Sequence, residues 1–292
     1  MGSTWVLWAL LSAFMGATND ALTKRVLADH DEYLIAWLRL LWALPFFALA
    51  IVFVPFPMLD STFFLAFFTS LPLEIAALVL YVKALKLSPL SITVPFLSLT
   101  PVFLIVVPYV VLGERISFTG AVGVLMIGFG GYTLNIREMK KGILAPLTAI
   151  RQEKGSLYMI GVALIYSFTS TLGKAAVEHS SPVFFGVTYN TALTIALTPL
   201  ALYMTRANSR LWSCRTAITG SLLPGFCHAA GILSHMIAIS PTQVAYMVSV
   251  KRLSLPMGVL YGWLLFRETN IRERLAGTFL MVAGFALIIL FH

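Results

Sequence analysis

The chain has 292 residues, of which 59% are hydrophobic and 11% charged, and its formal net charge is +8. Soluble domains average about 45–50% apolar and about 25% charged residues, so a water-soluble fold of this length could not cover its apolar surface. This composition excludes a water-soluble enzyme, a disordered chain and a nucleic-acid binder. An excess of basic residues is typical of the cytoplasmic loops of membrane proteins, so we expect a multi-pass protein in the lipid bilayer.

Ten apolar stretches are long enough to cross a bilayer, which takes about 20 helical residues. In chain order they cover residues 4–23, 33–54, 61–84, 89–112, 117–136, 156–177, 182–205, 216–239, 241–266 and 273–291. The predicted fold class is therefore an all-α membrane protein with ten transmembrane helices. Several of these stretches contain prolines, which a bilayer tolerates because neighbouring helices satisfy the freed carbonyl groups.

The connections between these spans differ in charge. The odd-numbered connections carry 15 of the 20 lysines and arginines, whereas the even-numbered ones carry only Arg115. Basic loops stay in the cytoplasm. We therefore predict that the odd connections are cytoplasmic and that both termini lie outside.

The sequence contains two copies of a five-helix unit. One glutamate and two glycines recur 154 residues apart: Glu114, Gly123 and Gly130, then Glu268, Gly277 and Gly284. An odd number of spans per copy inverts the second copy relative to the first, as in many transporters that bind substrate at the midplane between their repeats. The expected division is a first repeat over residues 1–136, a polar cytoplasmic linker over 137–155 and a second repeat over 156–292. The glycines are expected to allow close helix packing.

Three segments resemble a known repeat signature. They are Ser-Leu-Thr-Pro-Val-Phe at 98–103, Leu-Gly-Glu-Arg at 112–115 and Gly-Trp-Leu-Leu-Phe-Arg-Glu at 262–268. Together with the glycine-rich fifth span they resemble the EamA-type branch of the drug/metabolite transporter superfamily, over essentially the whole chain. The resemblance implies a ten-helix basket of two inverted repeats that moves metabolites across the cytoplasmic (cell) membrane, without specifying a substrate.

The ninth span contains two adjacent cations, Lys251 and Arg252. The pair resembles the Lys-Arg pair that organophosphate/phosphate exchangers of the same superfamily use to hold a phosphate. Ionisable residues inside a membrane are costly and usually functional. Adjacent residues on a helix point about 100° apart, so we expect one cation to address substrate and the other to pair with protein. The alternative is that protein carboxylates neutralise both.

Glu74 and His228 lie mid-span, and their numbers also differ by 154. Glu74 is predicted either to neutralise Lys251 or Arg252 until an anionic substrate displaces it, or to carry a coupling proton, because burial favours the protonated carboxyl. His228 titrates near physiological pH without special help. Its alternative role is helix packing.

Two further candidates have weaker signals. Arg39 lies six residues into the second span, where its long stem could instead reach the interface. Tyr246 lies five residues before Lys251, roughly 7.5 Å along a helix axis, and its hydroxyl needs a polar partner. Asn19, Asp20 and Lys24 cluster near the end of the first span, and Lys174 occupies the matching region of the sixth. They are expected either to form a gate at the cytoplasmic mouth or to mark the interface.

These features favour a secondary transporter, an exporter or exchanger of a small polar or anionic metabolite working by alternating access. No nucleotide-binding Gly-x-x-x-x-Gly-Lys-Ser/Thr segment occurs in the sequence, so ATP is not expected as the direct energy source. The alternative is a lipid flippase in which the Lys-Arg pair holds a lipid phosphate. An intramembrane enzyme is a distant third, because no catalytic set converges, and we expect neither a cofactor nor a metal.

Overall fold

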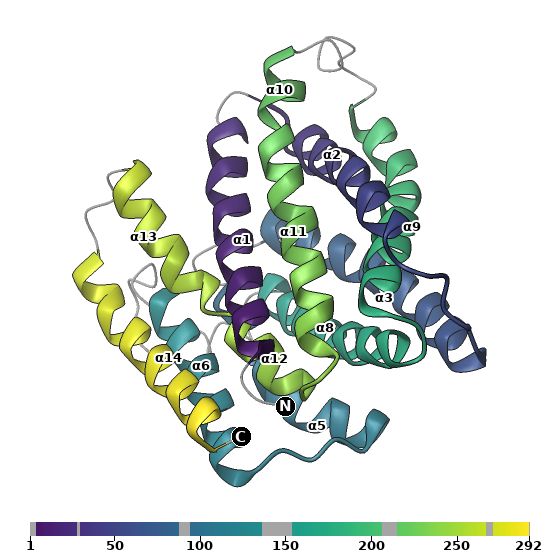
Figure 1. Cartoon of the computed structure of the whole chain (residues 1–292). Coiled ribbons are helices and arrows are strands. Elements are labelled where there is room, and N and C mark those ends of the chain that lie inside the picture. Colours follow the sequence, from purple (N-terminus) through teal and green to yellow (C-terminus); the bar gives the residue numbers. More distant parts are fainter. Residues whose placement is uncertain are drawn as a thin grey trace.

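The computed structural model describes residues 4–27, 30–87, 94–135, 154–205, 215–266 and 271–291. Every regular element in these ranges is a helix, and Figure 1 shows the helices gathered in one bundle. The two termini lie at one end of this bundle, and α10 lies at the opposite end (Figure 1). The predicted linker falls outside the described residues except for its last two, with which α8 begins, and Glu268 also falls outside them.

The helices follow the order of the predicted spans. The first repeat contains α1 (Thr4–Leu27), α2 (Glu32–Val52), α3 (Ser61–Leu87), η1 (Val94–Leu99), α5 (Thr100–Leu112) and α6 (Phe118–Asn135). The second contains α8 (Lys154–Glu178), α9 (Pro182–Thr205), α10 (Arg215–Gly220), α11 (Leu222–Ile239), α12 (Val244–Lys251), α13 (Ser254–Phe266) and α14 (Ile271–Phe291). Five stretches are long and apolar enough to cross a membrane: α2, α3, α8, α9 and the α10–α11 pair. The chain is thus a multi-pass membrane protein, and the full count of ten spans stays a prediction.

The sequence predicted a single helix for the ninth span, and the structure shows two. The span divides into α12 and α13, with Arg252 and Leu253 forming a turn between them. Pro256 explains the break, because a proline has no N–H and its ring collides with the carbonyl group four residues earlier. That carbonyl belongs to Arg252, and it accepts a hydrogen bond from the backbone N–H of Leu255 at 2.9 Å instead.

The fourth span contains a matching break. The 3₁₀ helix η1 gives way to α5 at Thr100, and Pro101 lies in the first turn of α5. The carbonyl four residues before this proline, that of Leu97, accepts a hydrogen bond from the Thr100 hydroxyl at 2.8 Å. Both repeats therefore contain a discontinuous helix at matching positions, and inverted-repeat transporters build their substrate sites at such helices. In the second repeat the described residues contain a further break, between α10 and α11.

The glycines of α6 and α14 join the two repeats. A Cβ added at Gly123 would lie 2.7 Å from the carbonyl oxygen of Gly284, and one added at Gly130 would lie 2.7 Å from that of Gly277. Such separations are possible only without side chains, so the predicted packing role of these glycines is confirmed. Packing between the repeats is reciprocal, since α3 lies against α8 and its counterpart α11 lies against α1.

Candidate substrate site

A cavity of about 1090 Å³ lies between the two repeats. Its lining comes from α2, α3 and the start of α5 in the first repeat and from α8, α9, α11, α12 and the start of α13 in the second. Five of the six predicted site residues line it: Arg39, Glu74, His228, Lys251 and Arg252. Residues from four different helices thus meet in one cavity.

Lys251 and Arg252 both line this cavity, and the backbone at Arg252 keeps helical angles, with φ of −63° and ψ of −13°. That one of them addresses substrate while the other pairs with protein stays a prediction. Lys251 is the last residue of α12, and Arg252 already belongs to the turn. The carbonyl groups at a helix C-terminus carry a partial negative charge that stabilises nearby cations. The end of α12 therefore offers two positive side chains to the cavity.

The cations in the cavity lack carboxylate partners. Within the described part of the chain, no Asp or Glu oxygen lies within 4.0 Å of the charged nitrogens of Arg39, Lys251 or Arg252. The Nε atoms of Arg39 and Arg252 are buried and have no hydrogen-bond partner. An uncompensated buried charge is strongly unfavourable. The charges of these three cations are therefore not neutralised at ion-pair distance by the described residues.

Two carboxylates lie near these cations without forming close ion pairs. Glu74 is near Lys251, and its carboxylate also contacts the hydroxyl of Thr169. Asp20, on α1, is within electrostatic range of both Arg39 and Lys251. The described lining contains four basic residues (Arg39, Lys83, Lys251 and Arg252) and one acidic residue (Glu74), which leaves a positive excess.

Arg39 is held in place by a neighbouring amide. In the orientation that satisfies both ends of the Asn19 amide, its oxygen accepts a hydrogen bond from Arg39 Nη1 at 3.2 Å, and its nitrogen donates to the carbonyl oxygen of Pro224 at 3.1 Å. This contact links α1, α2 and α11 beside the cavity. Arg39 thus lines the cavity instead of extending to the interface, which was its alternative role.

His228 and His235 face the cavity from one side of α11. Each has a buried ring nitrogen without a hydrogen-bond partner, Nε2 of His228 and Nδ1 of His235. Among the residues that the structure describes, no group of three His, Cys, Asp or Glu side chains is arranged to hold a metal ion. The two rings are available as polar contacts for a bound molecule.

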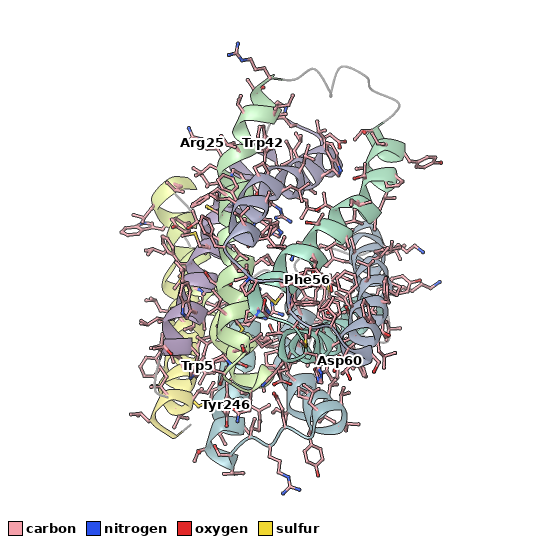
Figure 2. All side chains as sticks on the ribbon, turned by 45° about the vertical axis from the view of Figure 1, so that its right-hand side comes forward. Trp5, Arg25, Trp42, Phe56, Asp60 and Tyr246 are labelled. Carbon is pink, nitrogen blue, oxygen red and sulfur yellow. The ribbon has the colours of Figure 1, made fainter. Side chains whose placement is uncertain are left out.

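Tyr246 does not line the cavity, contrary to the sequence prediction. Its hydroxyl accepts a hydrogen bond from the backbone N–H of Ser117 at 3.1 Å and lies 3.3 Å from the Ser117 hydroxyl. The ring occupies space that a side chain at Gly120 would fill. Tyr246 therefore packs α12 against the start of α6, toward the end of the molecule that also carries Trp5 (Figure 2).

Several cavity residues were absent from the candidates chosen from sequence: Trp37, Lys83, Thr169, Ser170 and Asn190. Asn190 is buried on α9, and its amide nitrogen donates to the carbonyl oxygen of Gly186 at 2.8 Å. Neutral polar residues of this kind are common in membrane helices, where they bond to their own backbone. The cavity residues differ from other neutral polar residues only in that they face the cavity, and the sequence does not indicate which residues do so.

The residues that line the cavity differ in exposure. At one end of its lining lies Lys83, which is exposed, near the end of α3. At the other end lie Phe185 and Ile239, each 1% exposed, from the start of α9 and the end of α11. The closed end is therefore the one toward the α5–α6 and α11–α12 connections.

A sequence profile of the EamA-like transporter family matches the chain twice, over residues 3–136 and 153–290. The chain belongs to the EamA-like transporter family. The resemblance seen in the sequence motifs is thereby confirmed, and the protein is a membrane transporter of this family. No curated protein matches the chain. A solved structure titled "Crystal structure of protein" has a TM-score of 0.73 at 17% identity, covering 99% of this chain and 98% of its own. At 17% identity, this similarity shows that the two proteins share a fold.

Proposed function

We propose that this EamA-like transporter carries a small organic anion by alternating access, and that Lys251, Arg252 and Arg39 bind the anion. The observation that carries the proposal is a cavity between the repeats in which no carboxylate of the described residues lies within ion-pair distance of Arg39, Lys251 or Arg252. An anionic substrate supplies the missing negative charge. Carboxylate and phosphate groups both suit a guanidinium, which binds them through two parallel hydrogen bonds.

The site is asymmetric although its scaffold repeats. The offset of 154 that relates Glu114 to Glu268 pairs Lys251 with Leu97 and Arg252 with Ser98. Only the second repeat therefore supplies the adjacent cations, whereas both repeats supply the helix break. One charged group of the substrate binds the α12 end, and the rest of the molecule lies toward α2, α3 and α9.

We infer that the transporter works by exchange. Closing the cavity around uncompensated cations would move them into a medium of low dielectric constant, which is costly. A bound anion removes that cost, so the loaded protein changes state faster than the empty one. Glu74 is the internal counter-charge near Lys251, and it is also the residue that would carry a proton if transport is proton-coupled.

The lipid flippase is the second candidate, and a specific feature of the cavity favours it. Leu193, Leu197 and Leu200 line the cavity from α9, forming an apolar strip about 10 Å long at about 1.5 Å per residue. Such a strip suits an acyl chain beside a phosphate held by Arg252. We rank it below the soluble anion because polar side chains, among them Thr169 and Asn190, line the same cavity.

The charge distribution of the connections supports an orientation with both termini outside the cell membrane. In this orientation, the exposed Lys83 end of the cavity faces the cytoplasm. The conformation is then open inward.

Exchange in proteoliposomes tests the proposal. Vesicles are loaded with unlabelled organic phosphates, dicarboxylates or nucleotides, and uptake of the labelled compound is measured with and without a pH gradient. We expect Lys251→Ala and Arg252→Ala to lower exchange at least tenfold, while Arg25→Ala, outside the cavity lining, retains it. An assay of fluorescent phospholipid transfer in the same vesicles tests the lipid flippase alternative. If both cavity variants exchange normally, the anion site is wrong.

A further inference from the structure

A second buried lysine lies directly behind the closed end of the cavity. Lys174, near the end of α8, is 7% exposed and follows the lining residue Gly173. Its ammonium group forms an ion pair with Glu114 and donates a hydrogen bond to the carbonyl oxygen of Thr242 at 2.6 Å. A third oxygen, from Glu178 one turn later, lies 3.5 Å away. Unlike the cations of the cavity, Lys174 is fully partnered.

The local sequence explains how Glu114 reaches this lysine. Gly113 ends α5 in the left-handed conformation, with φ of 70°. In this conformation the N–H groups of Gly113 and Glu114 bond back to the carbonyl groups of Tyr109 and Pro108 at 3.1 and 3.2 Å, a common helix C-terminal motif that favours glycine. The chain turns inward immediately after α5, and this turn directs the glutamate toward the second repeat.

Glu114 uses both of its carboxylate oxygens. Oε1 pairs with Lys174, and Oε2 accepts the backbone N–H of Val244 at 2.9 Å. Glu114 belongs to the first repeat, whereas Lys174, Thr242 and Val244 all belong to the second. The cluster therefore joins the α5–α6 connection to α8 and to the α11–α12 connection, across the boundary between the repeats.

We propose that Glu114 and Lys174 form a latch that closes this end of the cavity and separates whenever the cavity opens there. The proposal rests on alternating access, the mechanism inferred above. The position of the latch supports it, because Gly173 and Ile239 of the cavity lining immediately precede its α8 and α11–α12 components. No route can open between these segments while Glu114 bridges them.

The chemistry of the pair suits a contact that is repeatedly broken. The closed latch is electrically neutral, so burial leaves no uncompensated charge. When it opens beside the end of the bundle, water can replace each hydrogen bond at little net cost. A contact in mid-membrane would lack that compensation. Tyr246 and Ser117 add a second polar contact between the repeats at the same end.

Thiol labelling tests the latch without any substrate. A variant with Cys214→Ser and Cys227→Ser receives Ser170→Cys, which places a thiol in the cavity lining. The oriented protein in vesicles is treated with a membrane-impermeant maleimide on the side of Glu114. We expect Glu114→Gln and Lys174→Met each to raise the labelling rate at least tenfold, which is about 1.4 kcal/mol in the population of the open state.

Two further variants separate a latch from a structural contact. Glu178→Gln removes only the 3.5 Å partner, whose side chain is 44% exposed, and should leave labelling unchanged. Exchanging the charges, Glu114→Lys with Lys174→Glu, should return labelling toward the starting rate. Lower thermal stability with an unchanged labelling rate in both single variants would refute the latch. Because labelling needs no anion, a failed exchange assay leaves this result interpretable.

Discussion

Two buried lysines, Lys174 and Lys251, should respond in opposite directions when each is replaced by methionine. Methionine keeps the length of the apolar stem and removes the charge. Lys174 is paired with Glu114 and bonded to a backbone carbonyl group, so its loss leaves a buried carboxylate without a cation. Breaking a buried pair in this way costs about 3–5 kcal/mol.

Removing the charge of Lys251 should have the opposite effect on stability, since no described carboxylate lies within ion-pair distance of its ammonium group. A lysine at the centre of a membrane helix costs about 2.5–3.5 kcal/mol. Water in the cavity and the nearby Glu74 offset part of that cost, so Lys251→Met should stabilise the substrate-free protein by about 1 kcal/mol, while it abolishes anion exchange. The two substitutions are therefore expected to change stability in opposite directions, although both residues are lysines inside helices.

Thermal unfolding of the purified variants in detergent measures both effects. At about 2–4 °C per kcal/mol for a chain of this size, Lys174→Met should lower the Tm by roughly 6–20 °C and Lys251→Met should raise it by about 2–4 °C. Lys83→Met, at an exposed position, is the control and should change little. A Tm for Lys251→Met as low as that of Lys174→Met would mean that Lys251 is paired, and the reasoning about the empty site would fail.

Three other substitutions test the packing and the closed end. Gly284→Leu should prevent recovery of monodisperse protein in size-exclusion chromatography, because even a Cβ there would lie 2.6 Å from a carbonyl oxygen of α6, whereas Gly258→Leu, with nothing within 4 Å, should be recovered normally. Tyr246→Phe removes the hydroxyl that contacts the N–H and hydroxyl groups of Ser117 outside the cavity and should cost about 1 kcal/mol of stability with normal exchange. Lost exchange would return Tyr246 to the site. The pKa of Asp60 is lowered by the first backbone N–H groups of α3 and by His179. The ionised carboxylate therefore stabilises the folded protein above the ordinary aspartate pKa of about 3.9. This contribution is lost as the pH falls through the lower pKa of Asp60 in the folded protein. Asp60→Asn should lack this acid-dependent change in Tm, and identical profiles for both proteins would contradict it.

Much of the site could be chosen from sequence because charge inside an apolar span is conspicuous. Lys251, Arg252, Glu74 and Arg39 were candidates for that reason alone, and all four line the cavity. Tyr246 was also a candidate, but it lies outside the cavity lining. A tyrosine in a span needs a polar partner, but the sequence does not say whether that partner is a substrate or the backbone of Ser117.

The sequence by itself determined the class of the protein and its family, because hydropathy, the charge of connections and a repeat at an offset of 154 are properties of the linear chain. The glycines of the repeat also indicated the packing of α6 on α14, since only residues without side chains allow backbones to touch. Only the tertiary structure decided which charges are paired. Glu114 and Lys174 are 60 positions apart and meet because a left-handed Gly113 turns the chain inward. Lys251 and Arg252 line one cavity with Arg39, Glu74 and His228 from other helices, and both groupings depend on how distant backbones pack.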